Sequence, residues 1–595
     1  MTTPFVLFES YTGSGHSFLF DGCVEEISAR AHRKIIPAVR HVETAVKQGF
    51  HAAGFISYEA ALGFDADLCV KSGSDFPLLW FGIFKERREI SAGEFFRKGN
   101  FELSDWQPSI DETQYQNAVE KIRERIAAGD TYQVNFTFRL RAKFRGEAFA
   151  LYHQLCRSQR AGYCAYISFG KYQIISTSPE LFFHWKDGQL TTRPMKGTHR
   201  RGRTTAEDAR FAEQLQTSIK ERAENVMIVD LLRNDMGHIS EHGSVSVPKL
   251  FEIERYPTVL QMTSTITSRL LSSVGFTEIL QALFPSGSVT GAPKISTMQI
   301  ISQLEDSPRK IYTGAIGFLS PGPEAMFNVA IRTLLIDTQT ELDFGERLDR
   351  ARRGLSRAVE VGVGSGITYS SSPKAEYEEC LLKAKFIERR QPEFALLETI
   401  LYESRSGYFL LNRHLARLED SAAYFGFNFD KEKINGILQE AATSMQDGNY
   451  KVRLMVHRDG RVIVEKKSAQ DESCATVAIA KEPVNSNEVF LFHKTTHRAI
   501  YTSRAASRPD CDDVLLVNEK GELTESTIAN LVMRIGGKDY TPPVSCGLLA
   551  GTFRAELLAQ EKIIERILYL ADLQKAETIF LINSVRRWIA VKLIS

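Results

Sequence analysis

The sequence predicts an α+β protein in which mixed β-sheets and helices build two domains. Its 595 residues are too many for one hydrophobic core. Short apolar runs bounded by turns alternate with amphipathic helices along the chain. A polar stretch that ends at Pro392 interrupts this alternation, and a new pattern begins at Phe394. We therefore expect a first domain over residues 1–388, a linker over 389–393 and a second domain over 394–595.

The early elements show this alternation most clearly. Residues 4–8, 54–58 and 78–84 have the apolar runs of strands. Residues 114–129 have helical apolar spacing and end at a glycine, and residues 132–140 again indicate a strand. Residues 220–235 and 376–388 have the pattern of charged helices.

Composition excludes several classes of function. The net charge of +1 gives no general attraction to nucleic acid or membrane. No apolar run is long enough to cross a bilayer, and the start lacks an export signal. None of the eight cysteines forms a Cys-x-x-Cys pair, which argues against zinc or a redox dithiol. We expect a cytoplasmic enzyme with reduced cysteines.

Lys196 is the first candidate catalytic residue. It lies in the run Arg-Pro-Met-Lys-Gly-Thr, after Leu190 and two threonines, which predicts a strand that ends in a turn at Gly197. A lysine in that setting can lie in a pocket, and a desolvated amine becomes a nucleophile. A single lysine is more often a surface charge, so the prediction depends on the motifs that follow it in the chain.

Two pairs of glutamates suggest a cation site. Glu221 and Glu224 are three residues apart on a predicted helix, and Glu376 and Glu379 repeat this spacing far downstream. Two such pairs could close on one Mg²⁺, which prefers oxygen ligands. The same spacing is also common on solvated helix faces.

Three further features suggest anion binding. The run Gly-Val-Gly-Ser-Gly at 362–366 can bring backbone N–H groups to a carboxylate. Residues 286–294 predict a loop that leads into a helix, with a proline near its start. Arg332 alternates with apolar residues as on a strand, and a half-buried arginine needs either a structural carboxylate or an anionic substrate.

With these runs in place, residues 1–388 resemble the chorismate-utilising family, which includes anthranilate synthase component I, aminodeoxychorismate synthase component I and the isochorismate and salicylate synthases. The resemblance implies large β-sheets with helices. It also implies a Mg²⁺ ion that binds the ring carboxylate of chorismate. The residues that hold this ion are Glu221, Glu224, Glu376 and Glu379. The substrate-binding residues that it implies are Tyr312, Arg332, Gly364, Gly366, Thr290 and Lys294. The matching runs are residues 129–135, 178–182, 193–198, 220–235, 284–294, 312–317, 329–333, 362–367 and 375–383.

Two catalytic positions distinguish members of this family. Gln133 stands where water-adding members carry a lysine, and glutamine cannot act as that base. Lys196 stands where anthranilate synthases usually have alanine, which is the pattern of aminodeoxychorismate synthase. The resemblance implies that Lys196 attacks C2 of chorismate and that ammonia then enters at C4. Gln261 departs from the family, which often has histidine there, so a proton-shuttling role does not transfer.

The second domain has the residues of a pyridoxal phosphate site. Such a site needs a lysine for the Schiff base, an acid near the pyridine nitrogen and an anion site for the phosphate. Lys494 follows an apolar run over residues 489–492 that predicts a strand. Lys494, Glu525 and Arg417 suit these roles. Hydroxyl residues before apolar runs suit helix starts or turns that donate N–H groups; they are Ser526, Thr527 and Thr552.

Residues 394–595 resemble the fold-type IV pyridoxal phosphate family, which includes branched-chain aminotransferases and aminodeoxychorismate lyase. The strings Lys-Thr-Thr-x-Arg and Thr-Glu-Ser-Thr-Ile-Ala-Asn are most similar to the lyase. About thirty residues that usually come first in this family, including its first strands, are missing. The sheet edge that those strands form is therefore either supplied by the first domain or left short.

Together the two resemblances imply a bifunctional enzyme that converts chorismate to 4-aminobenzoate through 4-amino-4-deoxychorismate. An anthranilate-type synthase fused to an aminotransferase is the alternative. No cysteine lies in the glycine turn of a glutaminase, so we expect a separate glutamine amidotransferase subunit to supply ammonia. The oligomeric state stays open, with a dimer through the second domain as one option.

Overall fold

The computed structural model describes residues 3–12, 15–96, 99–341, 356–388, 392–469 and 476–594. Residues 389–391 of the expected linker and Cys474 lie outside these ranges. The chain forms two compact units. The first unit contains residues 1–200 and 212–391, and the second contains residues 392–595 together with Arg201–Phe211.

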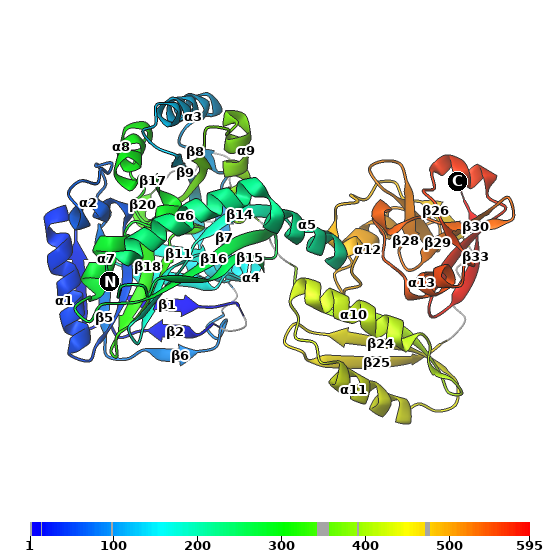
Figure 1. Ribbon diagram of the computed structural model, residues 1–595. Coiled ribbons are helices and arrows are strands. Elements are labelled where there is room, and N and C mark those ends of the chain that lie inside the picture. Colours follow the sequence, from blue (N-terminus) through cyan, green and yellow to red (C-terminus); the bar gives the residue numbers. More distant parts are fainter. Residues whose placement is uncertain are drawn as a thin grey trace. The chain divides into compact units, whose positions relative to one another are not determined.

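Two large sheets, A and B, build the first unit (Figure 1). Sheet A has the order β17-β9-β21-β20-β11-β10-β1-β2-β6, with β7 and β8 also paired to β9. Its strands are β1 (Phe5–Glu9), β2 (Ser17–Phe20), β6 (Arg88–Ile90), β7 (Phe101–Leu103), β8 (Gln107–Pro108), β9 (Gln133–Gly146), β10 (Tyr163–Phe169), β11 (Tyr172–Ser178), β17 (Gly291–Ala292), β20 (Thr333–Glu341) and β21 (Arg357–Ile367).

Sheet B has the order β14-β16-β13-β12-β19-β18-β4-β5-β3, with β15 also paired to β16. Its strands are β3 (Glu25–Ala29), β4 (His51–Ile56), β5 (Leu79–Phe84), β12 (Leu181–Lys186), β13 (Gln189–Arg193), β14 (Met195–Arg200), β15 (Ser246–Arg255), β16 (Val259–Arg269), β18 (Ala315–Ser320) and β19 (Glu324–Val329).

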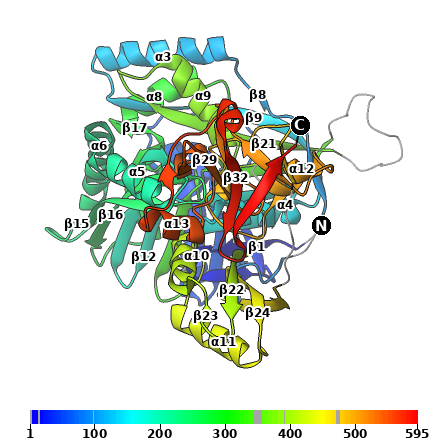
Figure 2. The same ribbon diagram turned by 90° about the vertical axis from the view of Figure 1, so that its right-hand side faces the viewer.

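Hydrophobic packing arranges the first unit in four layers. An aromatic-rich core that includes Phe8, Phe55 and Phe318 joins the facing sides of the two sheets. The outer face of sheet B packs on helices α1 (Ile35–Lys47), α6 (Ile219–Gly237) and α7 (Phe276–Leu283). The outer face of sheet A packs on α3 (Glu112–Ala127), α4 (Ala148–Gln159), α8 (Lys294–Leu304) and α9 (Pro373–Ala384). Helices α3, α8 and α9 gather near β9 and β17, as both views show (Figures 1 and 2).

The second unit also has two sheets. The smaller has the order β23-β22-β24-β25 and packs on α10 (Leu411–Phe425) and α11 (Lys431–Thr443). Its strands are β22 (Leu396–Glu403), β23 (Gly407–Tyr408), β24 (Asn449–Val456) and β25 (Val462–Ser468).

The larger sheet of the second unit has the order β28-β27-β26-β33-β32-β29-β30-β31. The helices next to its strands in the chain are α12 (Ala499–Ala506) and α13 (Thr552–Ala559). Its strands are β26 (Thr476–Ile479), β27 (Asp513–Val517), β28 (Leu523–Ser526), β29 (Asn530–Ile535), β30 (Lys538–Thr541), β31 (Ile564–Glu565), β32 (Thr578–Asn583) and β33 (Arg587–Leu593).

The anchor segment, Arg201–Phe211, belongs to the second unit although its sequence neighbours belong to the first. The Arg201 side chain forms an ion pair with Asp208 and donates a hydrogen bond to the Tyr424 carbonyl. The Tyr424 hydroxyl donates to the Gly202 carbonyl at 2.6 Å. The segment therefore packs beside α10 and does not add a strand to the four-stranded sheet.

Three local predictions were wrong. Gly197 lies within β14 at φ +103°, where the strand pairing shifts register, and not in a terminal turn. Arg332 lies between β19 and β20 at φ +49°, and not on a strand. Residues 489–491, predicted as part of a strand, form a 3-10 helix whose first turn is capped by Glu488. Short apolar runs do not distinguish these conformations.

No helix in the described ranges is both long and apolar enough to cross a membrane.

Candidate active sites

Contacts between β14 and α6 position Lys196. The Asn225 side chain on α6 donates to the Lys196 carbonyl at 3.2 Å and accepts from the Ser264 hydroxyl at 2.6 Å. This buried amide holds the helix against the strand. As a result, Lys196 Nζ lies 3.0 Å from Glu224 Oε2, with 21% of the lysine side chain exposed.

Gln133 and Gly366 complete the surroundings of the amine. A Cβ atom added to Gly366 would lie 2.8 Å from Lys196 Nζ and 2.9 Å from Gln133 Nε2. A larger residue at 366 would therefore displace the lysine amine or the glutamine amide. Gln133 Oε1 is buried and has no hydrogen-bond partner among the described residues, which suits a site that receives a polar ligand.

The four predicted metal ligands are only partly brought together. Burial, Glu224 and then Glu379 raise the pKa of Glu221, so these three carboxylates share one electrostatic neighbourhood. Glu379 pairs with Lys383 at 2.8 Å, and Glu376 accepts from the Ser371 hydroxyl at 2.8 Å. In the described ranges no three acidic, histidine or cysteine side chains already converge on one point. Their oxygen donors and mutual repulsion nevertheless fit a hard cation.

Tyr312 lies against the glycine run of β21. A Cβ atom on Gly362 would lie 2.1 Å from two ring carbons of Tyr312, so the ring rests flat on this glycine. The next glycine in the run, Gly364, accepts a hydrogen bond from Lys383 Nζ at 3.0 Å through its carbonyl. Burial raises the pKa of Tyr312 to about 12, although Lys383 acts in the opposite direction.

The remaining predicted substrate residues have structural partners. Arg332 donates to Gln159 Oε1 at 2.7 Å, and burial lowers its pKa. Lys294 forms a 2.9 Å ion pair with Asp235. Thr290 is buried and donates to the carbonyls of the preceding turn. Of the two charged side chains in this set, Lys294 is paired with a carboxylate, whereas the hydrogen bond of the Arg332 guanidinium goes to a neutral amide.

Glu180 is a functional candidate to which the sequence gave no role, although it lies in the matching run at 178–182. Burial raises its pKa to about 7, against hydrogen bonds from the Ser288 hydroxyl and the Met195 backbone. It therefore adjoins both the 286–294 loop and the residue before Lys196. Gln261, by contrast, bonds Gly197 and Thr198 and secures β14.

In the second unit, Lys494 is close to the other predicted cofactor residues. Burial lowers its pKa to about 8, and Arg417 acts in the same direction. The Lys494 carbonyl accepts from Leu397 N at 3.0 Å, which ties the lysine to the start of β22. Glu525 and Arg498 also affect the pKa of Lys494. Arg417, Glu525 and Arg498 therefore all lie near the lysine amine.

Glu525 lies in a network that sequence reasoning did not anticipate. Its Oε1 accepts from the Tyr501 hydroxyl at 2.8 Å and from Leu549 N at 3.1 Å, and its Oε2 accepts from Asn530 at 3.2 Å. Burial nevertheless raises its pKa to about 7. Asn530 lies in the matched Glu-Ser-Thr-Ile-Ala-Asn string, so its spacing from Glu525 was the available signal.

Arg417 is oriented by a buried carboxylate. Two of its nitrogens donate to Glu398 at 2.7 and 2.8 Å, and a third donates to the Ala550 carbonyl. His414 also contacts Glu398 at 2.7 Å and lies 3.2 Å from the Thr552 hydroxyl. Burial alone would raise the pKa of Glu398, but Arg417 and His414 bring it down to about 2. Arg417 and Thr552, at the start of α13, thus lie at one locus suited to an anion.

Two other predicted hydroxyls serve the local turn. Thr527 Oγ1 donates to Asp513 at 2.6 Å, and its carbonyl accepts from Arg498. The Ser526 hydroxyl donates to the Ala529 carbonyl at 3.0 Å. Both shape the loop that follows Glu525.

Known proteins match each part of the chain. A family model for chorismate binding enzymes matches residues 96–389, and a model for class IV aminotransferases matches residues 395–594. Anthranilate synthase component 1 of Methanothermobacter thermautotrophicus is 35% identical over 353 residues, which cover 56% of this chain and 72% of that protein. Aminodeoxychorismate synthase component 1 of Escherichia coli K12 is 36% identical over 302 residues, which cover 51% and 63% respectively.

A solved structure agrees with these matches. Anthranilate synthase component I from Streptococcus pneumoniae TIGR4 has a TM-score of 0.54 and 27% identity, and covers 64% of this chain and 93% of its own. Most of the other curated relatives are matched over 35–63% of their length. The chain therefore belongs to the chorismate-binding enzymes and carries a class IV aminotransferase domain behind that part.

Proposed function

We propose that the chain is a bifunctional enzyme of 4-aminobenzoate formation. The first unit aminates chorismate to 4-amino-4-deoxychorismate, and the second eliminates pyruvate from this product. The observation that carries the proposal is a lysine at 196 placed beside Gln133 and Gly366 in a chorismate-binding fold. Such a lysine provides an amine nucleophile. Gln133 cannot act as a base, so attack by an activated water is not available as a substitute.

In the first unit, the Lys196 amine attacks C2 of chorismate. The new C2–N bond forms as the two ring double bonds shift to C1=C6 and C4=C5 and the C4–O bond breaks, and the departing hydroxide takes a proton and leaves as water. Ammonia then adds at C4, and the lysine leaves from C2. Before attack the amine must leave its ion pair with Glu224 and lose a proton.

Glu180 is suited to supply the proton for the leaving hydroxyl. A carboxyl with a pKa of about 7 is protonated in a large part of the molecules near neutral pH. Arg332, whose guanidinium is bonded to a neutral amide, is suited to hold a substrate carboxylate. Mg²⁺ held by Glu221, Glu224, Glu376 and Glu379 would supply electrostatic binding of the ring carboxylate.

In the second unit, the residues fit pyridoxal 5′-phosphate, which supplies an electron sink when bound. Arg417 and Thr552 would hold the phosphate, and Thr527 shapes the adjoining loop. Glu525 would hold the proton of the pyridine nitrogen. Lys494 would take the proton from C4 of the substrate, and enolpyruvate would leave from C3, which makes the ring aromatic.

Ammonia comes from a separate glutamine amidotransferase subunit in this proposal, and we place the chain in the cytoplasm. The alternative of an anthranilate synthase fused to an aminotransferase draws on the Methanothermobacter relative. Lys196 argues against it, because release of pyruvate from the first unit would need no lysine nucleophile.

The test is a Lys196→Ala variant assayed with chorismate, Mg²⁺ and ammonium. We expect aminodeoxychorismate formation to fall by orders of magnitude, because truncation removes the nucleophile. The variant should still convert supplied aminodeoxychorismate to 4-aminobenzoate. Synthase activity near that of the unaltered chain would refute the role of Lys196, and anthranilate as the product would favour the alternative.

A further inference from the structure

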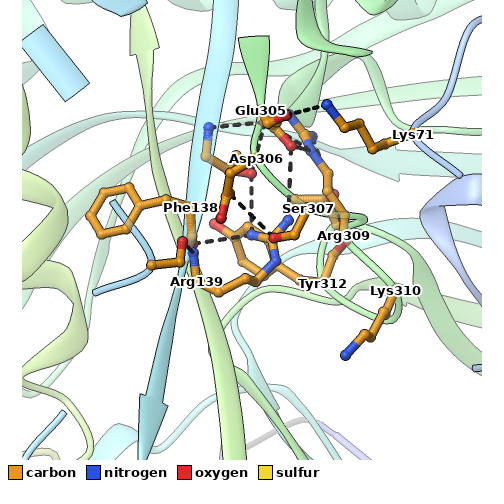
Figure 3. Close-up of polar contacts among 12 residues, drawn as sticks. Lys71, Phe138, Arg139, Glu305, Asp306, Ser307, Arg309, Lys310 and Tyr312 are labelled. Atoms are coloured by element: carbon orange, nitrogen blue, oxygen red, sulfur yellow. Dashed lines mark hydrogen bonds and ion pairs between the residues drawn. The ribbon is translucent and has the colours of Figure 1, made fainter. Parts of the chain in front are cut away.

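A buried ion cluster lies behind Tyr312 and contains Glu305, Arg309 and Arg139 (Figure 3). Arg309 donates to both carboxylate oxygens of Glu305 at 2.6–3.2 Å. Arg139 Nη2 lies 3.8 Å from the same carboxylate. The three side chains are at most 2% exposed. Buried charges are costly unless they are paired, so this arrangement calls for an explanation.

Arg309 and Glu305 connect the segments that surround the proposed site. Arg309 donates to the carbonyls of Asn135 at 2.7 Å and Val289 at 2.9 Å. Glu305 accepts from both the backbone and the hydroxyl of Thr137, at 3.0 and 2.8 Å. The Arg309–Glu305 pair therefore holds β9 against the 286–294 loop. This structural role does not require the second arginine, Arg139.

The cluster holds more positive than negative charge near neutral pH. Two guanidinium groups face the single carboxylate of Glu305. Two other acidic groups lie nearby. Glu360, whose pKa Arg139 helps to lower, is already paired with Lys310 at 3.2 Å and Arg141 at 3.0 Å. Glu59 accepts the backbone N–H groups of Arg309 and Lys310, but burial raises its pKa to about 7. Glu59 therefore cancels only part of the second positive charge.

The positively charged Arg139 side chain lies next to the Tyr312 ring. Its guanidinium carbon lies 5.3 Å from the centroid of the Tyr312 ring. Gly362 closes against the ring, as the 2.1 Å approach of an added Cβ shows. Arg139 Nη1 is fixed by bonds to the Thr137 hydroxyl and the Phe138 carbonyl. A cation held near an aromatic ring draws electron density from it and makes the phenolic O–H a stronger donor.

We propose that Arg139 is a positioning residue for chorismate: without touching the substrate, it fixes the Tyr312 ring and strengthens the hydrogen bond from its hydroxyl to a substrate carboxylate. This inference rests on the proposed function, since it takes Tyr312 to contact chorismate. It assigns Arg139 an effect on substrate binding that disappears when the Tyr312 hydroxyl is absent.

The test is a double-mutant cycle with Arg139→Met and Tyr312→Phe in the full chain, measured as KM and kcat for chorismate with ammonium. Each single variant should raise KM about tenfold with a smaller change in kcat, as expected for a lost hydrogen bond to an anion. In the double variant, KM should stay within about twofold of the larger single effect, because both changes remove one interaction.

Controls separate positioning from general damage. Arg141→Met makes the same change two residues along β9, where the side chain is 53% exposed. Its partner Glu360 keeps the ion pair with Lys310 at 3.2 Å, so this variant should leave KM within about twofold. The lyase step from supplied aminodeoxychorismate reports only on the second unit, so folding of the first unit is followed by circular dichroism and thermal unfolding of the full chain. If Arg139→Met does not fold, the cycle is run with Arg139→Lys, which keeps the charge and should show a smaller coupling with Tyr312→Phe.

Two results would overturn the inference. If the two single effects multiply in the double variant, to about a hundredfold, Arg139 does not act through Tyr312. If the unaltered chain forms no aminodeoxychorismate, the proposed function fails and this inference fails with it. The first result leaves the proposed function standing, so the two failures are distinguishable.

Discussion

At the scale of residues, one cause displaces two pKa values in opposite directions. Burial disfavours charge, so it lowers the pKa of Lys494 to about 8 and raises that of Glu525 to about 7. Near neutral pH both groups are thus close to their titration midpoints. A lysine that is readily neutral is suited to condense with an aldehyde, and an acid that readily holds a proton is suited to a pyridine nitrogen.

The pH dependence of cofactor uptake follows from the Lys494 value. Its folded pKa is lowered, so the reactive neutral amine predominates above about pH 8. The rate at which the apoprotein takes up pyridoxal phosphate should rise about tenfold per pH unit below pH 8 and level off above it. Stopped-flow absorbance would measure this, with Lys494→Ala as the control. A rate that still climbs steeply at pH 10 would contradict the lowered pKa.

Glu525→Gln should separate cofactor binding from chemistry. The amide keeps the size of the side chain, and its oxygen can still accept from Tyr501, but it loses the acceptor that Asn530 uses and cannot keep the pyridine nitrogen protonated. We expect the visible absorbance of the bound cofactor to persist while the lyase rate falls at least about a hundredfold. Unchanged turnover of aminodeoxychorismate would remove Glu525 from this role.

The sequence indicated residue types better than residue partners. Lys494, Glu525 and Arg417 were predicted from an ordered set of motifs, and their roles stay predictions. The 3.0 Å contact between Lys196 and Glu224 could not be foreseen, because it depends on how α6 packs on β14. The charge state of Glu180 was equally hidden, since burial raises its pKa and burial is set by the tertiary structure.

At the scale of elements, the first site depends on two helices from distant parts of the chain. Helix α6 carries Glu221 and Glu224, and α9 carries Glu376 and Glu379. Strand β14, which packs against α6, needs Gly197 at φ +103°, where an added Cβ would approach Glu221 Oε2 to 3.1 Å. Helical spacing predicted both helices correctly, whereas a glycine inside a strand looked like a turn.

Glu379→Gln should affect metal and substrate together. Removing one carboxylate charge should raise the Mg²⁺ concentration for half-maximal activity and weaken chorismate binding by a similar factor, about tenfold, because linked ligands share one coupling free energy. Magnesium titrations at several chorismate concentrations would show this. The exposed Glu378→Gln is the matched control, and a Glu379→Gln titration identical to that of the unaltered chain would exclude the residue from the site.

At the scale of the whole molecule, the nitrogen source is the open question. A glutaminase needs an activated nucleophile, and none of the eight cysteines in the sequence lies in a Gly-x-Cys-x-Gly turn. We expect the purified chain to form 4-aminobenzoate from chorismate with ammonium, faster at alkaline pH where more NH₃ is present. With glutamine it should need an added amidotransferase. Efficient glutamine-dependent product from this chain alone would show that a glutaminase site was missed.

The polar, proline-closed stretch near residue 390 predicted a division of the chain there, and the bounds of the two domains stay a prediction. The sequence did not predict that the anchor segment joins the second unit. Its arginines and glycine have the composition of an ordinary surface loop, and nothing local indicates that Arg203 accepts a hydrogen bond from His493 through its carbonyl or stacks on Phe492. Contacts of this kind depend on side chains nearly three hundred positions away.

The anchor segment has a consequence for synthesis on the ribosome. Gly202 and its partner Tyr424 are 222 residues apart, so at about 5–20 residues per second the segment waits about 10–45 s for its packing surface. Lys196 precedes the segment and Glu221 follows it. On the nascent chain, residues 201–211 therefore lack this packing partner until α10 has been made, although they lie between the proposed nucleophile and the first proposed metal ligand.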